Sequence, residues 1–290
     1  MKVTRFSENP IIRPLMDDRM GNNINGPSLI RVPDWVADPL GRYYLYFAHH
    51  QGDYIRLAYA DQLTGPWNIY TPGVLDLKDS FFNDHLASPD VVIMPERQEI
   101  RMYYHGQNKP DPGPHYQFER VAVSKDGLLF TAHGERLGNP YFRTFQWEGY
   151  TYALSMPGKF YRSKDGLTSF ERGPMLFSRD MRHSATRIDQ GVLQVFYTNA
   201  GDCPEKILLS TIELKPDWND WRITEPVTVL EPEMDYEGGN LSLAPSARGA
   251  IFEPARQLRD PCLYEEDNGI YLLYAVAGEN GIALAKVRDL

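Results

Sequence analysis

Short runs of aromatic and β-branched residues recur along the whole chain, and this repetition limits its fold more than any other feature. Tyr, Val, Ile and Phe fill the runs, and Gly, Pro, Asp and Asn separate them. Runs of this kind are typical of β-strands, whereas stretches with helical periodicity are scarce. The sequence therefore predicts an all-β protein.

The runs group into repeated units of three or four strands. We place five units at residues 22–80, 84–138, 139–180, 181–232 and 257–290. A β-sandwich has about seven to nine strands, fewer than these units require, and units of this size are typical of propeller blades. We therefore expect one five-bladed β-propeller domain over residues 1–290. The N-terminal run Val3–Phe6 supplies the strand that the last blade lacks.

The composition fits a folded domain and narrows its partners. The chain has 290 residues, of which 42% are hydrophobic and 24% charged, so it can bury a large core and is not a disordered chain. Its net charge of −9 argues against nucleic acid or an anionic membrane as the main partner. Cys203 and Cys262 are too few for a disulfide scaffold. No apolar leader or membrane-spanning segment is evident, so we expect a cytoplasmic protein.

Propeller geometry predicts where a site would form. The first strand of each blade lines the central channel, so its start lies on the same face as the turn between the second and third strands. The first-strand starts contribute Asn25, Asp84, His85, Asp90, Arg143, Arg182, His183, Arg259 and Asp260. The turns contribute His49, His50, Asp53, His105, Glu205 and Glu279.

Histidine placement is the strongest functional signal. Six of the seven histidines fall in or beside these segments: His49, His50, His85, His105, His115 and His183.

Some candidate residues also have a purely structural interpretation. Asp90 and Asp260 adjoin prolines, where carboxylates often bond backbone N–H groups. Arg182 and Arg259 suit ion pairs between blades, and Glu237 suits a loop cap.

Several motifs resemble those of the five-bladed glycoside hydrolases, which include family 43 arabinanases and xylosidases, family 32 fructosidases and family 117 anhydrogalactosidases. The likeness spans nearly the whole chain, and similar strings occur in family 130 mannoside phosphorylases. The motifs are Gly26-Pro27-Ser28-Leu29-Ile30 before Tyr43-Tyr44-Leu45-Tyr46, Ala60-Asp61-Gln62-Leu63-Thr64-Gly65-Pro66-Trp67, Ser88-Pro89-Asp90-Val91, and Arg259-Asp260-Pro261 before Tyr271-Leu272-Leu273-Tyr274.

The resemblance implies cleavage of a glycosidic bond in an oligosaccharide, but two expected catalytic positions differ. Family 43 enzymes usually have an aspartate base before the first-blade proline, where this chain has Gly26 next to Asn25. They have a glutamate acid near the start of blade four, where this chain has Arg182-His183-Ser184. A histidine acid is similar to what is proposed for family 117. The family 43 triad is therefore not transferred.

Glycoside hydrolysis needs a proton donor and a carboxylate that acts as base or nucleophile. Histidine has a reference pKa near ~6.5, which suits an acid at neutral pH, so His183 is the leading acid. Asp260 and Asp90 are the leading base or modulating groups, with Glu237 as an alternative acid. The remaining candidates would bind substrate: Asn25, His49, His50, Asp84, His85, His105, Arg143, Arg182, Arg259, Glu205 and Glu279.

Three alternatives remain open at this point. In a phosphorylase, Arg143, Arg182 and Arg259 would hold phosphate. A non-catalytic sugar-binding propeller would explain the missing first-blade aspartate. No cofactor is required, but histidines from separate blades would suit a divalent cation on the propeller axis. We expect residues 107–118 and 231–256 to shape the pocket, and the sequence leaves the oligomeric state open.

Overall fold

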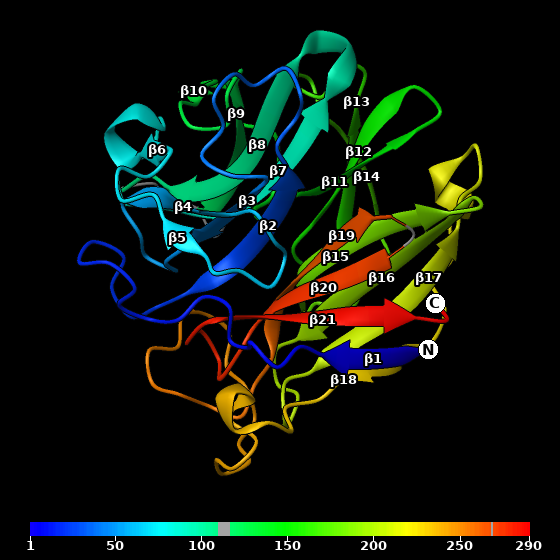
Figure 1. The fold of residues 1–290 in the computed structure, drawn as a ribbon. Coiled ribbons are helices and arrows are strands. Elements are labelled where there is room, and N and C mark those ends of the chain that lie inside the picture. Colours follow the sequence, from blue (N-terminus) through cyan, green and yellow to red (C-terminus); the bar gives the residue numbers. More distant parts are fainter. Residues whose placement is uncertain (110–116, 268) are drawn as a thin grey trace.

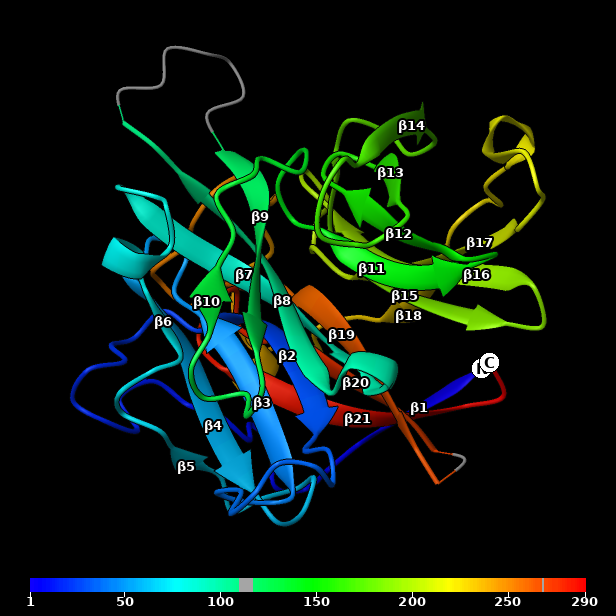
Figure 2. The same ribbon diagram turned by 90° about the horizontal axis from the view of Figure 1, so that it is seen from above.

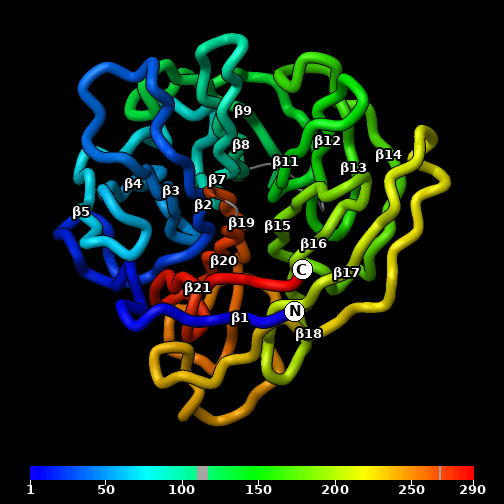
Figure 3. The backbone as a smooth tube through the Cα atoms, turned by 45° about the vertical axis from the view of Figure 1, so that its right-hand side comes forward, coloured from blue at the N-terminus to red at the C-terminus, as the bar shows by residue number. Residues whose placement is uncertain are grey.

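Five antiparallel sheets surround a common axis in the computed structural model, which describes residues 1–109, 117–267 and 269–290 (Figures 1 and 2). The prediction of an all-β, five-bladed propeller is confirmed. The first strands of the blades gather in the centre, and the later strands lie progressively outward (Figure 3). No helix within the described ranges is long and apolar enough to cross a membrane.

The blades follow one another along the chain. Blade one contains β2 (Asn25–Arg31), β3 (Tyr43–Ala48), β4 (Tyr54–Ala60), β5 (Asn68–Ile69) and β6 (Leu75–Asp76). Blade two contains β7 (His85–Met94), β8 (Glu99–Gln107), β9 (Gln117–Ser124) and β10 (Thr131–Ala132). Blade three contains β11 (Arg143–Trp147), β12 (Tyr150–Ser155), β13 (Lys159–Ser163) and β14 (Glu171–Met175).

The remaining two sheets complete the ring. Blade four contains β15 (Met181–Asp189), β16 (Val192–Asn199), β17 (Ile207–Glu213) and β18 (Val227–Leu230). Blade five contains β19 (Arg259–Glu266), β20 (Gly269–Ala275) and β21 (Ile282–Arg288), with β1 (Lys2–Arg5) as its outer strand. Short 3₁₀ turns occur at η1 (Leu77–Asp79), η2 (Pro95–Arg97), η3 (Trp218–Asp220) and η4 (Asp235–Glu237).

The hydrophobic core is divided among the junctions between blades. Tyr44 and Tyr46 of blade one pack in one cluster with Met102 and Tyr104 of blade two. A second cluster joins blades three and four, where Trp221 is fully buried. Each blade covers the apolar face of its neighbour. A strand can therefore carry polar residues between its apolar ones.

The entrance of each first strand has a residue in the left-handed backbone region. These residues are Gly26, Ser88, Tyr141, His183 and Asp260, with φ between 47° and 68°. In β2, β7, β15 and β19 the pairing register shifts at this point, as in a β-bulge. A bulge turns a side chain in a new direction, so each blade can aim one residue at the axis.

Blade one uses glycine at this position for a steric reason. A Cβ on Gly26 would lie 2.9 Å from the Cα of Ser88 in the neighbouring blade, closer than the backbone can accept. An aspartate therefore does not fit at the position where family 43 enzymes usually have their base. In this chain, the close approach of β2 and β7 leaves no room for a side chain at position 26.

The N-terminal strand closes the ring. β1 pairs with β21 from Lys2↔Arg288 to Arg5↔Ala285, so both chain ends lie side by side (Figure 3). The Arg5 guanidinium is 2.7 Å from Glu237, whose side chain is fully buried in η4. Tyr274 also donates a hydrogen bond to this carboxylate at 2.8 Å.

We predict that Arg5→Ala lowers the free energy of unfolding by about 3 kcal/mol, because removing one partner leaves a buried carboxylate without its opposite charge. Chemical denaturation at neutral pH measures the change. Arg288→Ala, an exposed residue of the neighbouring strand, is the control. Equal losses in the two variants would contradict the role assigned to the Arg5–Glu237 pair.

Candidate functional site

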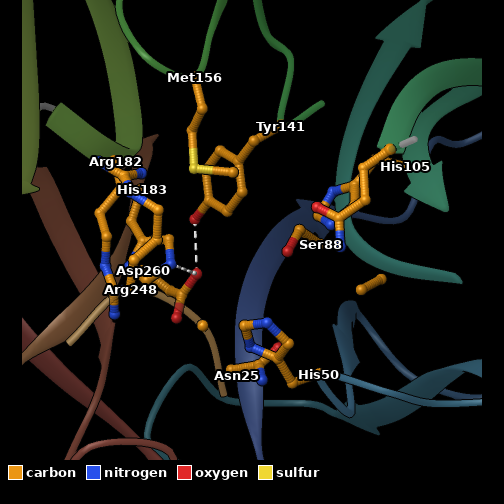
Figure 4. A pocket seen from close by; sticks show the side chains of 13 residues that line it. Asn25, His50, Ser88, His105, Tyr141, Met156, Arg182, His183, Arg248 and Asp260 are labelled. Carbon is orange, nitrogen blue, oxygen red and sulfur yellow. Dashed lines mark hydrogen bonds and ion pairs between the residues drawn. The ribbon is translucent and has the colours of Figure 1, made fainter. Parts of the chain in front are cut away.

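A pocket of about 370 Å³ lies among the starts of the inner strands (Figure 4). Its volume is at the lower end of the usual range for small-molecule sites, ~300–1,000 Å³. The lining residues come from all five blades and from the connector between blades four and five. They are Asn25, His50, Ala87, Ser88, His105, Gln117, Tyr141, Met156, Arg182, His183, Arg248, Gly249 and Asp260.

The left-handed residues contribute to the pocket wall from four of the five blades. Ser88, Tyr141, His183 and Asp260 all line the pocket, and in blade one the residue beside the glycine, Asn25, does so. His50 follows β3, and His105 lies near the end of β8. The structure thus brings six sequence-predicted residues to one pocket: Asn25, His50, His105, Arg182, His183 and Asp260.

Asp260 is the one carboxyl-bearing residue among the described residues that line this pocket. Its Oδ1 accepts a hydrogen bond from the Tyr141 hydroxyl at 2.7 Å and lies 3.8 Å from Nε2 of His183 (Figure 4). Burial, followed by the negative charge of Glu279, raises the pKa of Asp260 to about 6.

His183 is in the opposite situation. Burial and the nearby guanidinium groups of Arg182 and Arg259 hold the pKa of His183 well below its ordinary value. The imidazole is therefore neutral around pH 7. This charge state disfavours the acid role that the sequence suggested for His183.

His50 is held by a carboxylate. Its Nδ1 donates a hydrogen bond to Oε1 of Glu279 at 3.1 Å. Burial alone would raise the pKa of Glu279, but the hydrogen bonds from His50 and Asn23, with the Arg259 guanidinium, bring it down to about 2. Glu279 is thus ionised at every working pH and fixes the imidazole ring.

A chain of buried ion pairs lies behind the pocket. Arg182 is 3.0 Å from Glu205, Arg259 is 3.2 Å from the same carboxylate, and Arg259 is 2.8 Å from Glu279. All of these side chains are at most 2% exposed. Arg259, Glu205 and Glu279 do not line the pocket. Their contacts support blades four, five and one, so we expect them to act through Arg182 and His50.

Three other predicted residues lie beside the pocket and do not line it. The His49 ring packs against Phe252, with ring centroids 6.0 Å apart, and burial lowers the pKa of His49 to about 4. His85 Nδ1 lies 2.9 Å from Asp84, which also pairs with Lys109 at 2.6 Å. These contacts give all three residues local structural partners.

Asp90 and Arg143 face a second cavity of about 140 Å³ on the axis. It is lined by the residues two positions after the left-handed ring, namely Ser28, Asp90, Arg143, Ala185 and Cys262. Side chains two apart on a strand share a face, so this second ring repeats the first one deeper in the channel. Asp90 accepts two hydrogen bonds from Thr144 at 2.8 Å.

Two predictions fall elsewhere. Glu237 does not line the pocket. Its carboxylate is bound by Arg5 of the closing strand β1. The sequence did not reveal this contact, because the closure joins opposite ends of the chain. His115 lies outside the described residues. Within the described ranges no group of three or more His, Cys, Asp or Glu side chains could hold a metal ion, so no contact there supports the axial cation.

No protein-family model matches the sequence. The chain is 34% identical to the uncharacterized protein R118 of Acanthamoeba polyphaga mimivirus, over 98% of this chain and 90% of R118. The chain belongs to the family of R118.

Solved structures extend the likeness to the fold of this R118 family member. A glycosyl hydrolase from Bacteroides ovatus has a TM-score of 0.71 at 13% identity, covering 99% of this chain and 94% of its own. CoXyl43, a GH43 β-xylosidase/α-arabinofuranosidase from a compost microbial metagenome, solved with xylotriose, has a TM-score of 0.64 at 13% identity, covering 96% and 94%. The GH43_1 enzyme from Xanthomonas citri complexed with xylose has a TM-score of 0.65 at 10% identity, covering 97% and 91%. The protein therefore has the GH43 fold.

Sequence reasoning missed part of the lining. Ser88 and Tyr141 occupy the same place in their blades as His183 and Asp260, so aligning the unit starts would have found them. Gln117, Met156 and Arg248 carry no such signal. Arg248 comes from the long connector that follows β18, whose path the strand pattern does not define.

We predict that Asp260→Asn stabilises the protein more at pH 8 than at pH 4. The native carboxyl holds its proton up to about pH 6, whereas the unfolded one loses it near pH 3.8. The wild-type protein therefore loses stability as the pH rises between these values, by about 2–3 kcal/mol. The amide of the variant does not titrate, so the variant does not lose this stability. Its gain in stability over the wild-type protein therefore appears between pH 3.8 and about pH 6.

Denaturant titrations of both proteins at a series of pH values measure this difference. Asp34→Asn, which removes an exposed carboxyl, is the matched control and should leave the pH profile unchanged. A stability difference between wild type and Asp260→Asn that stays constant from pH 4 to pH 8 would rule out a buried, protonated Asp260.

Proposed function

We propose that this protein is a glycoside hydrolase that cleaves a terminal sugar from an oligosaccharide, with Asp260 as the proton donor. The observation that carries the proposal is a buried carboxyl with a pKa of about 6 in a sugar-sized pocket. The GH43 fold supports the same class of reaction, since a neighbour with this fold was solved with xylotriose.

Asp260 has the properties of a general acid. A catalytic pKa near the operating pH gives a group that both holds and releases its proton. Tyr141 donates to Oδ1 and so fixes the carboxyl plane, and the carboxyl proton goes to the leaving glycosidic oxygen. Transfer of this proton accompanies rupture of the bond between the anomeric carbon and that oxygen.

His50 is the proposed base. In the neutral ring with its proton on Nδ1, Nε2 accepts a proton from a water molecule whose oxygen forms the new bond to the anomeric carbon. Glu279 holds Nδ1–H and stabilises the imidazolium that forms, as the carboxylate does in a Ser-His-Asp triad. Proton exchange with solvent then returns the Asp260 carboxylate to its acid form and the His50 imidazolium to its neutral form. No step requires a cofactor.

This assignment moves the acid role from His183 to Asp260 and gives the role of base to His50. A neutral His183 beside Asp260 Oδ1 is suited to contact a sugar hydroxyl and to keep the carboxyl in place. Asn25 and His105 add further polar groups to the wall. Nδ1 of His105 is buried with no hydrogen-bond partner among the described residues, so it is available to a substrate hydroxyl.

A phosphorylase receives less support. Of the three arginines that would hold phosphate, Arg182 lines the pocket, whereas Arg143 faces the axial cavity and Arg259 is occupied by two carboxylates. A sugar-binding protein without activity would use the same pocket, and the catalytic test separates it from an enzyme.

We predict that, on a substrate found by screening oligosaccharides, Asp260→Asn and His50→Gln each lower kcat/KM by about 10²–10⁴-fold, the usual contribution of a positioned acid or base. Wild-type kcat/KM should fall as the pH rises above about 6, because Asp260 then loses its proton. His49→Gln, which alters the adjacent residue outside the pocket, is the control and should retain activity. Full turnover by Asp260→Asn would contradict the proposal.

A further inference from the structure

The charged side chains of the pocket lining are mostly positive, whereas the whole protein has a negative net charge. The chain has a net charge of −9, yet its pocket is lined by two guanidinium groups, those of Arg182 and Arg248, against the single carboxyl of Asp260. That carboxyl is itself protonated over part of the working pH range, since its pKa is about 6. The described lining therefore carries an excess of positive charge.

The layer behind the pocket holds charges of both signs. There, Arg259 pairs with Glu205 and Glu279, and Arg143 faces Asp90 in the axial cavity. Arg143 lies with its guanidinium carbon 4.1 Å from the centre of the Tyr141 ring, so its charge also lies next to the pocket wall. An occupant of the pocket thus meets two guanidinium groups, those of Arg182 and Arg248, and one carboxyl, that of Asp260.

Arg182 has unused hydrogen-bonding capacity. Its side chain is 2% exposed, Nε donates to Glu205 at 3.0 Å and Nη1 donates to the carbonyl oxygen of Ala247 at 2.9 Å. Nη2 is buried and has no partner among the described residues. Leaving a buried charged donor unpaired is costly, and an acceptor in the pocket would remove that cost.

Arg248, in the connector between blades four and five, supplies the second guanidinium of the pocket lining. It is exposed at the pocket, and its Nη2 donates to the carbonyl oxygen of Arg179 at 2.6 Å. Because Arg182 bonds the carbonyl of Ala247, the residue before Arg248, both arginines meet at one segment of the connector. Paired guanidinium groups suit a carboxylate or a sulfate ester, through charge-assisted hydrogen bonds.

We propose that the sugar bound in this pocket is anionic, a hexuronic acid or a sulfated hexose whose charged group lies against Arg182 and Arg248. The inference rests on the proposed function, because it names the substrate class of the same pocket. Both sugars carry one negative charge on a single ring. Coplanar oxygens hold this charge in the carboxylate, and clustered oxygens hold it in the sulfate ester.

Calorimetric titration of the full chain at pH 7 tests the inference with four probes: a hexuronic acid, the neutral hexose of the same configuration, the corresponding 6-sulfated hexose and inorganic phosphate. We expect one of the two anionic sugars to bind at least about tenfold more tightly than the neutral hexose, and the tighter of the two identifies the source of the charge. Arg248→Gln should reduce this preference by about tenfold. Arg222→Gln, an exposed arginine on the outer side of blade four, is the matched control and should leave it unchanged.

Binding of the neutral hexose as tightly as both anionic sugars would overturn this inference and leave glycoside hydrolysis intact. An anionic preference that survives in Arg248→Gln at its full size would also overturn it. Tighter binding of inorganic phosphate than of any sugar would overturn it in favour of a phosphate site. If no sugar binds and no oligosaccharide is cleaved, the proposed function fails and the inference fails with it.

Discussion

The site depends on one backbone constraint, the left-handed residue at the entrance of each inner strand. A regular strand would alternate its side chains between the two faces of its blade, and few would reach the axis. The left-handed residues at positions 26, 88, 141, 183 and 260 redirect the chain there, and four of the five line the pocket. Non-glycine residues in this region cost about 1–3 kcal/mol each, so the surrounding packing must hold them in place.

Buried ion pairs then fix the charges that this constraint gathers. The chain from Arg182 through Glu205 and Arg259 to Glu279 and His50 joins blades four, five and one. Charges that are fully buried are kept only where each has a partner. Among the described residues Asp260 has no Arg or Lys ion pair, and its carboxyl oxygen is bound by the neutral Tyr141 hydroxyl. The network thus explains why the pKa of Glu279 lies near 2 while that of Asp260 is raised to about 6.

The sequence predicted the fold well, because repeated strand runs carry the signal for blades. It also predicted Asp260, His183 and Asn25 as residues of one rim, since the geometry of a first strand is enough for that. It did not separate the pocket from the cavity below it. Asp90 and Arg143 lie two residues beyond Ser88 and Tyr141, so a bulge that the strand pattern does not reveal decides which residue reaches which cavity.

Long-range contacts account for the remaining differences. Glu237 looked available for catalysis because its partner Arg5 lies 232 residues away in the sequence. The charge state of His183 depends on burial and on the guanidinium groups of Arg182 and Arg259, and that of Asp260 on burial and on Glu279. Strand periodicity carries no information about either, so the sequence favoured histidine as the acid on reference pKa values alone.

Burial of Asp260 in the pocket wall raises the pKa of its carboxyl to about 6, and the proposed acid depends on this shift. Carbon-13 NMR of protein labelled at the aspartate side-chain carboxyl measures the pKa directly, with the Asp260 signal assigned by its loss in Asp260→Asn. We expect a titration midpoint near pH 6 for that signal. A midpoint near the ordinary aspartate value of about 3.9 would contradict it.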